Sequence, residues 1–309
     1  MLLALTFDIR PVTLVDNRNT SDPYLNLAIE EFLIRNLDCT NGDFFLLYIN
    51  EPCIVLGKNQ SIYKEINFEY LRNGQLKLCR RISGGGTVYH DQGNLSFAFI
   101  SKFEEHKINN YRWFNQPVVD ALNKIGVKAT MDERNNIIAN EKKISGNAQF
   151  TNRKNIISHG TLLFNADLNT LRSCLKQNDF IVESKAVGSV NSSVMNLKEI
   201  TNKFTSTSEL RNYLAKELNA ENIFRFTNEQ WKEIIKSAEE KFKSFEWIYG
   251  RSPLTKITKN EIEIEVEEGK IAEIRNFKYE IRNTKYEFTE IKKALEKFPN
   301  ASELICLLY

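Results

Sequence analysis

The segment between positions 80 and 91 has the composition of an anion-binding loop. Arg80 and Arg81 precede the triple glycine Gly84–Gly86, and the pair His90-Asp91 follows it. Glycine has no side chain, so a ligand can approach the backbone closely, and exposed N–H groups in such a turn can bind an anion. The guanidinium of Arg81 could grip phosphate or carboxylate through two donors. We expect an anionic or nucleotide ligand here, in preference to a sharp turn beside two surface arginines.

Lys143 is the second residue whose setting suggests chemistry. It lies in a strand-like segment that Gly146 interrupts. An ammonium group in a partly buried site can stabilise a phosphate or a developing acyl oxyanion. A surface lysine on an edge strand is the commoner case, and the spacing alone leaves that alternative open.

Two histidines and one cysteine are weaker candidates. His159 lies at a strand entry, where it could donate a hydrogen bond to a ligand or serve a structural role. His90 and Asp91 could form an acid–base pair, but adjacent strand residues point to opposite faces, so we expect His90 to orient the loop. Cys174 could be a thiol nucleophile, yet no histidine is near it in sequence, and a small buried side chain is the better interpretation.

The composition is that of a globular protein, with 309 residues, 42% hydrophobic and 27% charged. A net charge of +2 gives no argument for nucleic acid. No apolar run approaches the roughly 20 residues that span a bilayer, and the N-terminus lacks the features of a signal peptide. Five cysteines without Cys-x-x-Cys spacing favour reduced thiols and argue against structural zinc. We therefore expect a cytoplasmic protein that binds neither nucleic acid nor a membrane.

Hydrophobic periodicity predicts strands joined mostly by short connections, with helices interspersed. Asp22-Pro23 predicts the start of a helix that continues to about residue 36. The glycine-rich segment connects predicted strands at 76–79 and 95–100. Further helices are expected near 110–125 (with a kink or late start at Pro117), 167–175, 207–218 and 228–243, and further strands near 44–48, 53–56, 137–138, 143–150 and 161–164. This order predicts an α+β fold with a mixed, mostly antiparallel sheet.

The pattern changes between residues 245 and 254, where glycine and proline interrupt it. Beyond this break, isoleucine or valine alternates with glutamate over 261–266, as in a half-buried strand. A second strand and two short helical stretches close the chain. We predict a catalytic domain at 1–246, a linker at 247–253 and a small α+β domain at 254–309.

Several segments together resemble lipoate-protein ligase A, in the order and with the spacing of that family. They are Asp22–Glu31, Arg80–Asp91, Lys143–Gly146, His159–Leu163 and Trp247–Gly250. The resemblance implies the α+β catalytic fold shared with biotin-protein ligases, and a reaction in two steps. Lipoate and ATP give lipoyl-adenylate and pyrophosphate. The lipoyl group then passes to a lysine of an apo lipoyl domain, such as those of 2-oxoacid dehydrogenase acyltransferase subunits or the glycine cleavage H protein.

The resemblance also implies roles for individual residues. Lys143 would contact the lipoate carboxylate and the α-phosphate, Arg81 would bind phosphate, and the acyl chain would lie near Gly84 and Gly85. The residues expected to line ATP or lipoyl-adenylate are Gly86, Thr87, Val88 and Tyr89, with Ser83, His90, Asn135, Asn136 and His159 as further candidates. Mg²⁺ would come with the ATP phosphates rather than occupy a dedicated protein site.

Two positions depart from the family pattern. Asn136 replaces a usual aspartate, which could weaken metal binding, and Asn191 replaces a frequent arginine, which could weaken pyrophosphate binding. Both concern ATP activation, so we expect Asn136→Asp to raise adenylation without changing acyl transfer. The alternatives are a lipoyltransferase that uses preformed lipoyl-adenylate, a cysteine-dependent octanoyltransferase, and a ligand-binding homologue, against which the presence of Lys143 argues.

Overall fold

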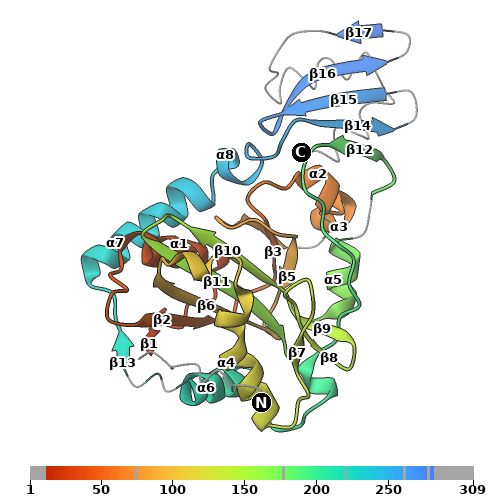
Figure 1. Ribbon diagram of the computed structural model, residues 1–309. Coiled ribbons are helices and arrows are strands. Elements are labelled where there is room, and N and C mark those ends of the chain that lie inside the picture. The colour runs from red at the N-terminus through yellow and green to blue at the C-terminus, as the bar shows by residue number, and fades with distance from the viewer. Residues whose placement is uncertain are drawn as a thin grey trace. The chain divides into compact units, whose positions relative to one another are not determined.

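The computed structural model describes residues 12–73, 76–175, 178–218, 220, 222–259, 262–276 and 279–281 (Figure 1). The chain forms two compact units, and each unit takes three separate stretches of sequence. Unit 1 comprises Met1–Glu51, Asp91–Ala166 and Ser192–Ile235, and unit 2 comprises Pro52–His90, Asp167–Asn191 and Lys236–Tyr309. The short connection between the predicted strands near 48 and 53 therefore leads from one unit to the other.

Unit 1 is built on a six-stranded sheet in the order β10-β11-β6-β2-β1-β13. The strands are β1 (Val12–Val15), β2 (Asp43–Tyr48), β6 (Asn94–Lys102), β10 (Asn147–Thr151), β11 (Asn155–Leu163) and β13 (Asn222–Phe224). The pairs β2–β6, β6–β11 and β10–β11 are antiparallel, whereas β1 runs parallel to β2 and to β13. A second, three-stranded sheet has the order β7-β8-β9, from β7 (Thr130–Met131), β8 (Ile137–Ala139) and β9 (Lys142–Ser145).

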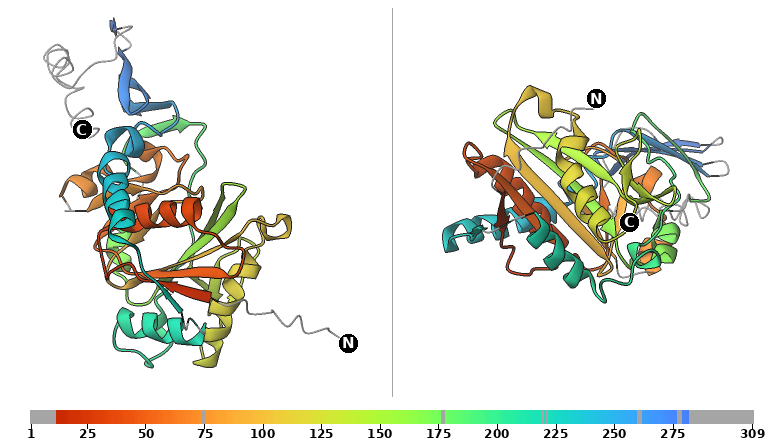
Figure 2. Two further views of the ribbon diagram at one scale, coloured as in Figure 1. Left: turned by 90° about the vertical axis from the view of Figure 1, so that its left-hand side faces the viewer. Right: turned by 60° about the horizontal axis from the view of Figure 1, so that its bottom comes forward.

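The helix α1 (Pro23–Asn36) begins where its capping residues predict. The carboxylate of Asp22 accepts hydrogen bonds from the backbone N–H groups of Tyr24 (2.8 Å) and Leu25 (3.4 Å), and Pro23 occupies the first turn. Figure 2 shows α1 on one face of the six-stranded sheet, with α4 (Tyr111–Lys124) and α6 (Thr207–Glu217) on the opposite face. The two faces of the sheet are therefore both covered.

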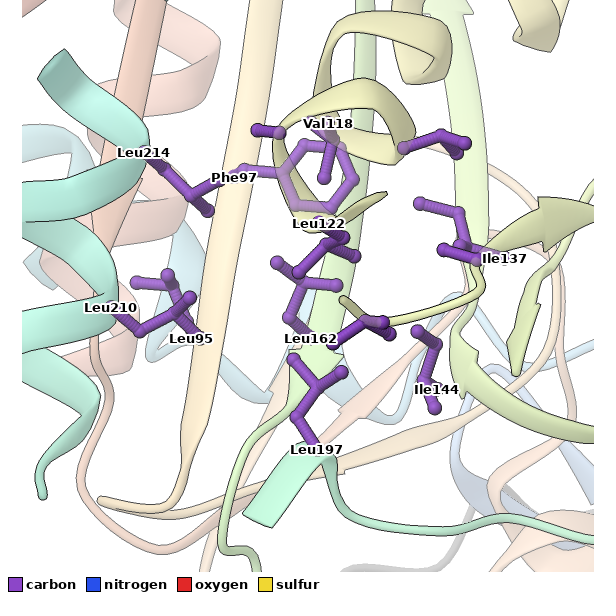
Figure 3. Packing of buried hydrophobic residues seen from close by; sticks show 14 of the residues in the cluster. Leu95, Phe97, Val118, Leu122, Ile137, Ile144, Leu162, Leu197, Leu210 and Leu214 are labelled. Atoms are coloured by element: carbon purple, nitrogen blue, oxygen red, sulfur yellow. The ribbon is translucent and has the colours of Figure 1, made fainter. Parts of the chain in front are cut away.

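The main core of unit 1 lies between the sheet and the helices α4 and α6 (Figure 3). Leu210 of α6 lies beside Leu95 of β6 and Leu214 beside Phe97, and Leu122 of α4 lies close to Leu162 of β11. Successive strand residues point to opposite faces of the sheet. The residues next in sequence to these buried strand residues therefore face α1. The alternation explains how both faces of the sheet are filled from the same strands.

Unit 2 contains a three-stranded sheet in the order β4-β3-β5 and a five-stranded sheet in the order β12-β14-β15-β16-β17. The smaller sheet consists of β3 (Cys53–Leu56), β4 (Lys77–Arg80) and β5 (Val88–His90), and the larger of β12 (Ile181–Ser184), β14 (Thr255–Lys259), β15 (Ile262–Glu267), β16 (Lys270–Asn276) and β17 (Tyr279–Ile281). In the described part of this unit the helices are α2 (Ile62–Glu65), α3 (Phe68–Asn73), α5 (Leu168–Cys174) and α8 (Phe245–Ile248). The helix α7 (Asn228–Ser237) begins in unit 1 and ends in unit 2.

Several elements differ from the sequence predictions. The glycine-rich segment does not lead directly to the strand near residue 95, because β5 intervenes and pairs with β3. The helix α4 begins at Tyr111 and continues through Pro117, so the proline does not delay its start. The helix predicted at 228–243 ends at Ser237 and is followed by a π-helical turn, Ala238–Phe242. The strands β12 and β14, which pair with each other, were not predicted.

The division into compact units follows boundaries other than the predicted domain limits, and β12 shares a sheet with the strands that follow residue 254. The domain limits stay a prediction. The two closing helical stretches lie outside the described residues.

Candidate active site

The glycine loop (residues 81–87) joins β4 to β5 and is organised around the buried side chain of Arg81. Its Nη2 donates to the carbonyl oxygens of Gly84 (2.6 Å) and Gly86 (2.8 Å), and its Nε donates to Ser83 Oγ (3.0 Å). These bonds fix the path of the loop backbone. The phosphate contact expected of Arg81 stays a prediction.

One glycine of this loop is required by its backbone conformation, and it lies against a second glycine outside the loop. Gly85 has φ of 86°, a left-handed conformation that side chains disfavour. Its carbonyl oxygen would lie 2.1 Å from a Cβ built on Gly57, so this close approach of the two backbones requires glycine at position 57. In contrast, a Cβ built on Gly84 meets no atom of the described residues within 4 Å. Ligand approach is therefore open at Gly84.

Thr87 is held by a buried polar cluster that the sequence did not predict. Its backbone N–H donates to Ser189 Oγ (2.9 Å), and its hydroxyl donates to Gln60 Oε1 (2.9 Å) and Glu65 Oε2 (3.2 Å). The hydroxyl of Ser189 donates in turn to Glu65. The segment that carries Ser189 and the exposed Asn191 therefore lies against the glycine loop. Of the remaining predicted residues in β5, Tyr89 and His90 are buried and Val88 is half-buried.

The neighbouring Arg80 is fully buried and has a structural role. Its guanidinium donates to the carbonyl oxygens of Ile248 (2.6 Å from Nη2), Gly57 (2.9 Å) and Gln60 (2.8 Å), and to Ser252 Oγ (3.1 Å). Burial lowers the pKa of Arg80 to about 10, with smaller contributions from two nearby arginines. Because both arginines are buried, the alternative of a turn beside two surface arginines is wrong.

Lys143 lies on β9, and its backbone is paired on both sides. Ile138 of β8 is its partner on one side, and on the other its N–H donates to Ser193 O (2.9 Å) and its carbonyl accepts from Met195 N (3.1 Å). The residue is half-buried, and the next residue, Ile144, is fully buried in the core (Figure 3). β9 is an edge strand of its three-stranded sheet, but the segment Ser193–Met195 covers that edge at Lys143. The catalytic role of the lysine stays a prediction.

Asn135 and Asn136 form a turn beside the strand of Lys143. The backbone N–H and the side-chain amide of Asn136 each donate to the carboxylate of Asp132, both at 2.8 Å. Asn147 Nδ2 donates to the carbonyl of Asn135 (2.8 Å), whose φ is 63°. The family pattern has an aspartate at position 136. In this chain the carboxylate of Asp132 lies in contact with Asn136 instead. Asp132 was not predicted as a site residue.

His159 lies on β11, on the face of the sheet that α1 covers. Its Nδ1 lies 2.7 Å from Oε2 of Glu30, a fully buried residue of α1. The sequence offered one hint of this pair, because Glu30 and His159 both lie in segments of family resemblance. A contact of His159 with a ligand stays a prediction.

The predicted site residues therefore form two groups. Arg81 and the residues up to His90 belong to unit 2, whereas Asn135, Asn136, Lys143 and His159 belong to unit 1. Among the described residues, no group of three or more histidine, cysteine, aspartate or glutamate side chains could hold a metal ion. Within the same part of the chain, no helix is long and apolar enough to cross a membrane.

The thiol of Cys174 is fully buried in α5 and donates to the carbonyl of Leu171 (3.4 Å). Burial raises its pKa to about 12. A nucleophilic thiol needs a depressed pKa and access to its substrate. Cys174 has neither property.

Comparison with known proteins decides the family. Residues 22–219 match the lipoyl protein ligase A/B catalytic domain. The chain is also 37% identical over 277 residues to lipoate-protein ligase LplJ of Bacillus subtilis (strain 168), which covers 85% of this chain and 83% of that protein. The chain belongs to the lipoate-protein ligase family. The resemblance drawn from the motifs is confirmed, and with it the prediction of a ligase.

Solved structures share the fold of this lipoate-protein ligase family member. A T. acidophilum protein with a provisional assignment as a lipoate protein ligase, solved with bound lipoic acid, is 24% identical and covers 78% of this chain and 99% of that chain, with a TM-score of 0.65. A lipoate-protein ligase A bound with ATP is 23% identical and covers 78% and 98%, with a TM-score of 0.64. The predicted α+β fold is confirmed.

Proposed function

We propose that this protein activates lipoate with ATP and transfers the lipoyl group to a lysine of an apo lipoyl domain. The observation that carries the proposal is Lys143, in a chain of the lipoate-protein ligase family. Its backbone is paired on both sides, so the side chain that carries the ammonium projects from a fixed strand. Rigid placement matters because a preorganised charge stabilises a transition state without reorganising.

In the first step, a lipoate carboxylate oxygen attacks the α-phosphorus of ATP, and the bond to the leaving pyrophosphate breaks. In the second step, the neutral amine of the acceptor lysine attacks the acyl carbon, AMP leaves with the bonding electrons, and the amine loses a proton. Negative charge develops on phosphate oxygens first and on the carbonyl oxygen second. The ammonium of Lys143 offsets both charges.

The nucleotide is assigned to the glycine loop. The nucleotide is lined by Gly86, Thr87, Val88 and Tyr89. The open space at Gly84 leaves room for the ligand to approach the backbone closely. Arg81 holds the loop carbonyls in position, and phosphate binding by this residue is part of the proposal. Mg²⁺ enters with ATP as part of the substrate and neutralises phosphate charge.

The reaction is placed in the cytoplasm. Cys39 and Cys174 are free, buried thiols, which suit a reducing compartment. The acceptor is a folded protein domain that presents a lysine. The matching family is described as a protein ligase, which supports a protein acceptor. A cysteine-dependent octanoyltransferase is disfavoured by the burial and raised pKa of Cys174.

A lipoyltransferase is the second candidate, because Asn136 and Asn191 stand where the family pattern has charged groups. Two assays separate it from a ligase. The first measures lipoate-dependent exchange of labelled pyrophosphate into ATP in the presence of Mg²⁺, with omission of lipoate as the control. The second measures transfer from synthetic lipoyl-adenylate to an apo lipoyl domain. A ligase supports both, whereas transfer without exchange establishes the lipoyltransferase.

A further inference from the structure

Gly146 lies at the break between β9 and β10, three residues after Lys143, and faces the end of that lysine side chain. A Cβ built on Gly146 would lie 2.9 Å from Cε and 2.9 Å from Nζ of Lys143. Real Cβ atoms essentially never approach other heavy atoms this closely. Apart from its chain neighbours, these are the only atoms of the described residues within 4 Å of that position. The lysine ammonium therefore occupies the space that a side chain at residue 146 would need.

The fold itself makes no demand for glycine at this position. The glycines of the described residues that adopt left-handed backbone angles are Gly85, Gly126 and Gly269, so the backbone at Gly146 is open to alanine. Gly93, also in unit 1, is by contrast required by packing. A Cβ on Gly93 would lie 2.0 Å from the carbonyl oxygen of Asn165. At Gly146 the obstacle is the flexible end of one side chain and not backbone.

The backbone around Lys143 and Gly146 is fixed, so only the lysine side chain can move. Lys143 pairs with Ser193 and Met195, and the carbonyl of Gly146 accepts a hydrogen bond from Thr161 N (3.1 Å). An added methyl group would displace the ammonium by rotation about the bonds of its four-carbon stem. The displacement leaves the strands in place and moves the charge.

We propose that Gly146 is a positioning residue, whose missing side chain provides the seat in which the Lys143 ammonium lies during both steps. This inference rests on the proposed role of Lys143 in acyl transfer. A catalytic group displaced by about 1 Å can cost on the order of 10²-fold in rate. Gly146 thus acts on the reaction through the location of a charge that another residue carries.

The test is a double-mutant cycle on transfer from synthetic lipoyl-adenylate to an apo lipoyl domain, measured in single turnovers. Gly146→Ala should keep the melting temperature of the unmodified protein, lower the transfer rate about 10- to 100-fold, and leave the KM for the acceptor domain unchanged. In a Lys143→Ala background, Gly146→Ala should have no further effect on the residual rate. Non-additivity of this kind is the mark of two residues that act as a unit.

Two further variants serve as controls. Lys142→Ala removes an exposed neighbouring ammonium and should leave the rate unchanged. Gly93→Ala, where the built Cβ meets backbone, should lower the melting temperature and so show that the assay detects a glycine needed for packing.

The outcomes separate this inference from the proposed function. If Lys143→Ala transfers lipoyl groups at the normal rate, the proposed role of the lysine fails. If Lys143→Ala is impaired but Gly146→Ala is fully active, the positioning role is wrong. The same conclusion follows if Gly146→Ala lowers the rate equally with and without Lys143, because the glycine would then act on the substrate directly.

Discussion

Glu30 of α1 and His159 of β11 form a buried pair, with 2.7 Å between Oε2 and Nδ1. The second carboxylate oxygen accepts the hydroxyl of Tyr48 on β2 at 3.0 Å. A buried carboxylate is costly unless it is hydrogen-bonded, and here two donors from neighbouring parts of the sheet satisfy it. A carboxylate at Nδ1 also fixes the hydrogen on that nitrogen and the orientation of the ring.

Glu30→Gln should destabilise unit 1, because Tyr48 and His159 meet different carboxylate oxygens and the amide replaces one of these oxygens by an NH2 group. We expect a loss of about 1 to 3 kcal/mol in the free energy of unfolding, measured by urea denaturation. Tyr48→Phe removes a single donor and serves as the milder control. Equal stability of Glu30→Gln and the unmodified protein would show that the pair does not hold the helix to the sheet.

Lys143→Ala should leave the fold intact and remove most activity. The loss of one electrostatic group that acts on developing charge typically costs on the order of 10² to 10³ in rate. The measurement is the transfer of lipoyl groups from synthetic lipoyl-adenylate, together with circular dichroism to establish the fold. Near-normal transfer would exclude the lysine from catalysis.

Cys174→Ser should retain activity, because the thiol is buried and its pKa is raised to about 12. The variant is assayed for lipoyl transfer beside the unmodified protein. Mass spectrometry of the unmodified protein after incubation with an acyl donor tests whether the thiol becomes acylated. An acyl group trapped as a thioester on Cys174 would favour the octanoyltransferase alternative.

Alkaline pH should destabilise the folded state through Cys39 and Cys174, the pKa of each raised by burial from 9.0 to about 12. The folded state binds these protons more tightly than the unfolded state. The stabilisation is therefore fully present below about pH 9 and is lost as the pH rises toward about 12. Each thiol should contribute about 1 kcal/mol per pH unit to this slope. Cys174→Ala should flatten the pH dependence of the unfolding free energy, and an unchanged slope would contradict the burial argument.

Asn136→Asp should not raise adenylation in the way that the sequence alone suggests. The side-chain amide of Asn136 donates to Asp132 at 2.8 Å, so an aspartate would place two carboxylates in contact and raise the pKa of one of them. We expect lower pyrophosphate exchange at neutral pH. The exchanged pair, Asp132→Asn with Asn136→Asp, removes the repulsion and is the matched control. Higher exchange in the single variant than in the unmodified protein would refute this expectation.

Local signals were sufficient to predict much of the fold. The capping carboxylate of Asp22 and the proline after it establish the start of α1 within a few residues. The alternation of side chains predicts β6 in the same way. By contrast, the pairing of β3 with both β4 and β5 depends on which strands meet in space, and no local pattern encodes it.

The site shows the same division between local and distant information. Residue types and spacing suggested Arg81, and the family resemblance suggested Lys143, but neither indicated the direction in which the Arg81 guanidinium points. Glu65 and Ser189 were missed because their contact joins positions 124 residues apart. The role of Gly146 follows only from the course of the Lys143 side chain. Function was thus readable from motifs, whereas the supporting contacts needed the three-dimensional structure.

The hydrogen bonds of Arg80 have a consequence for folding during synthesis on the ribosome. The guanidinium is buried against Ile248 and Ser252, which follow it by 168 and 172 residues. At synthesis rates of about 5 to 20 residues per second, these acceptors emerge roughly 10 to 30 s after the arginine. Until then, the guanidinium has only earlier acceptors such as the carbonyl oxygens of Gly57 and Gln60, and β4 lacks part of its final surroundings. The hydrogen bonds that surround Arg80 are therefore completed late in translation, after the chain has passed residue 252.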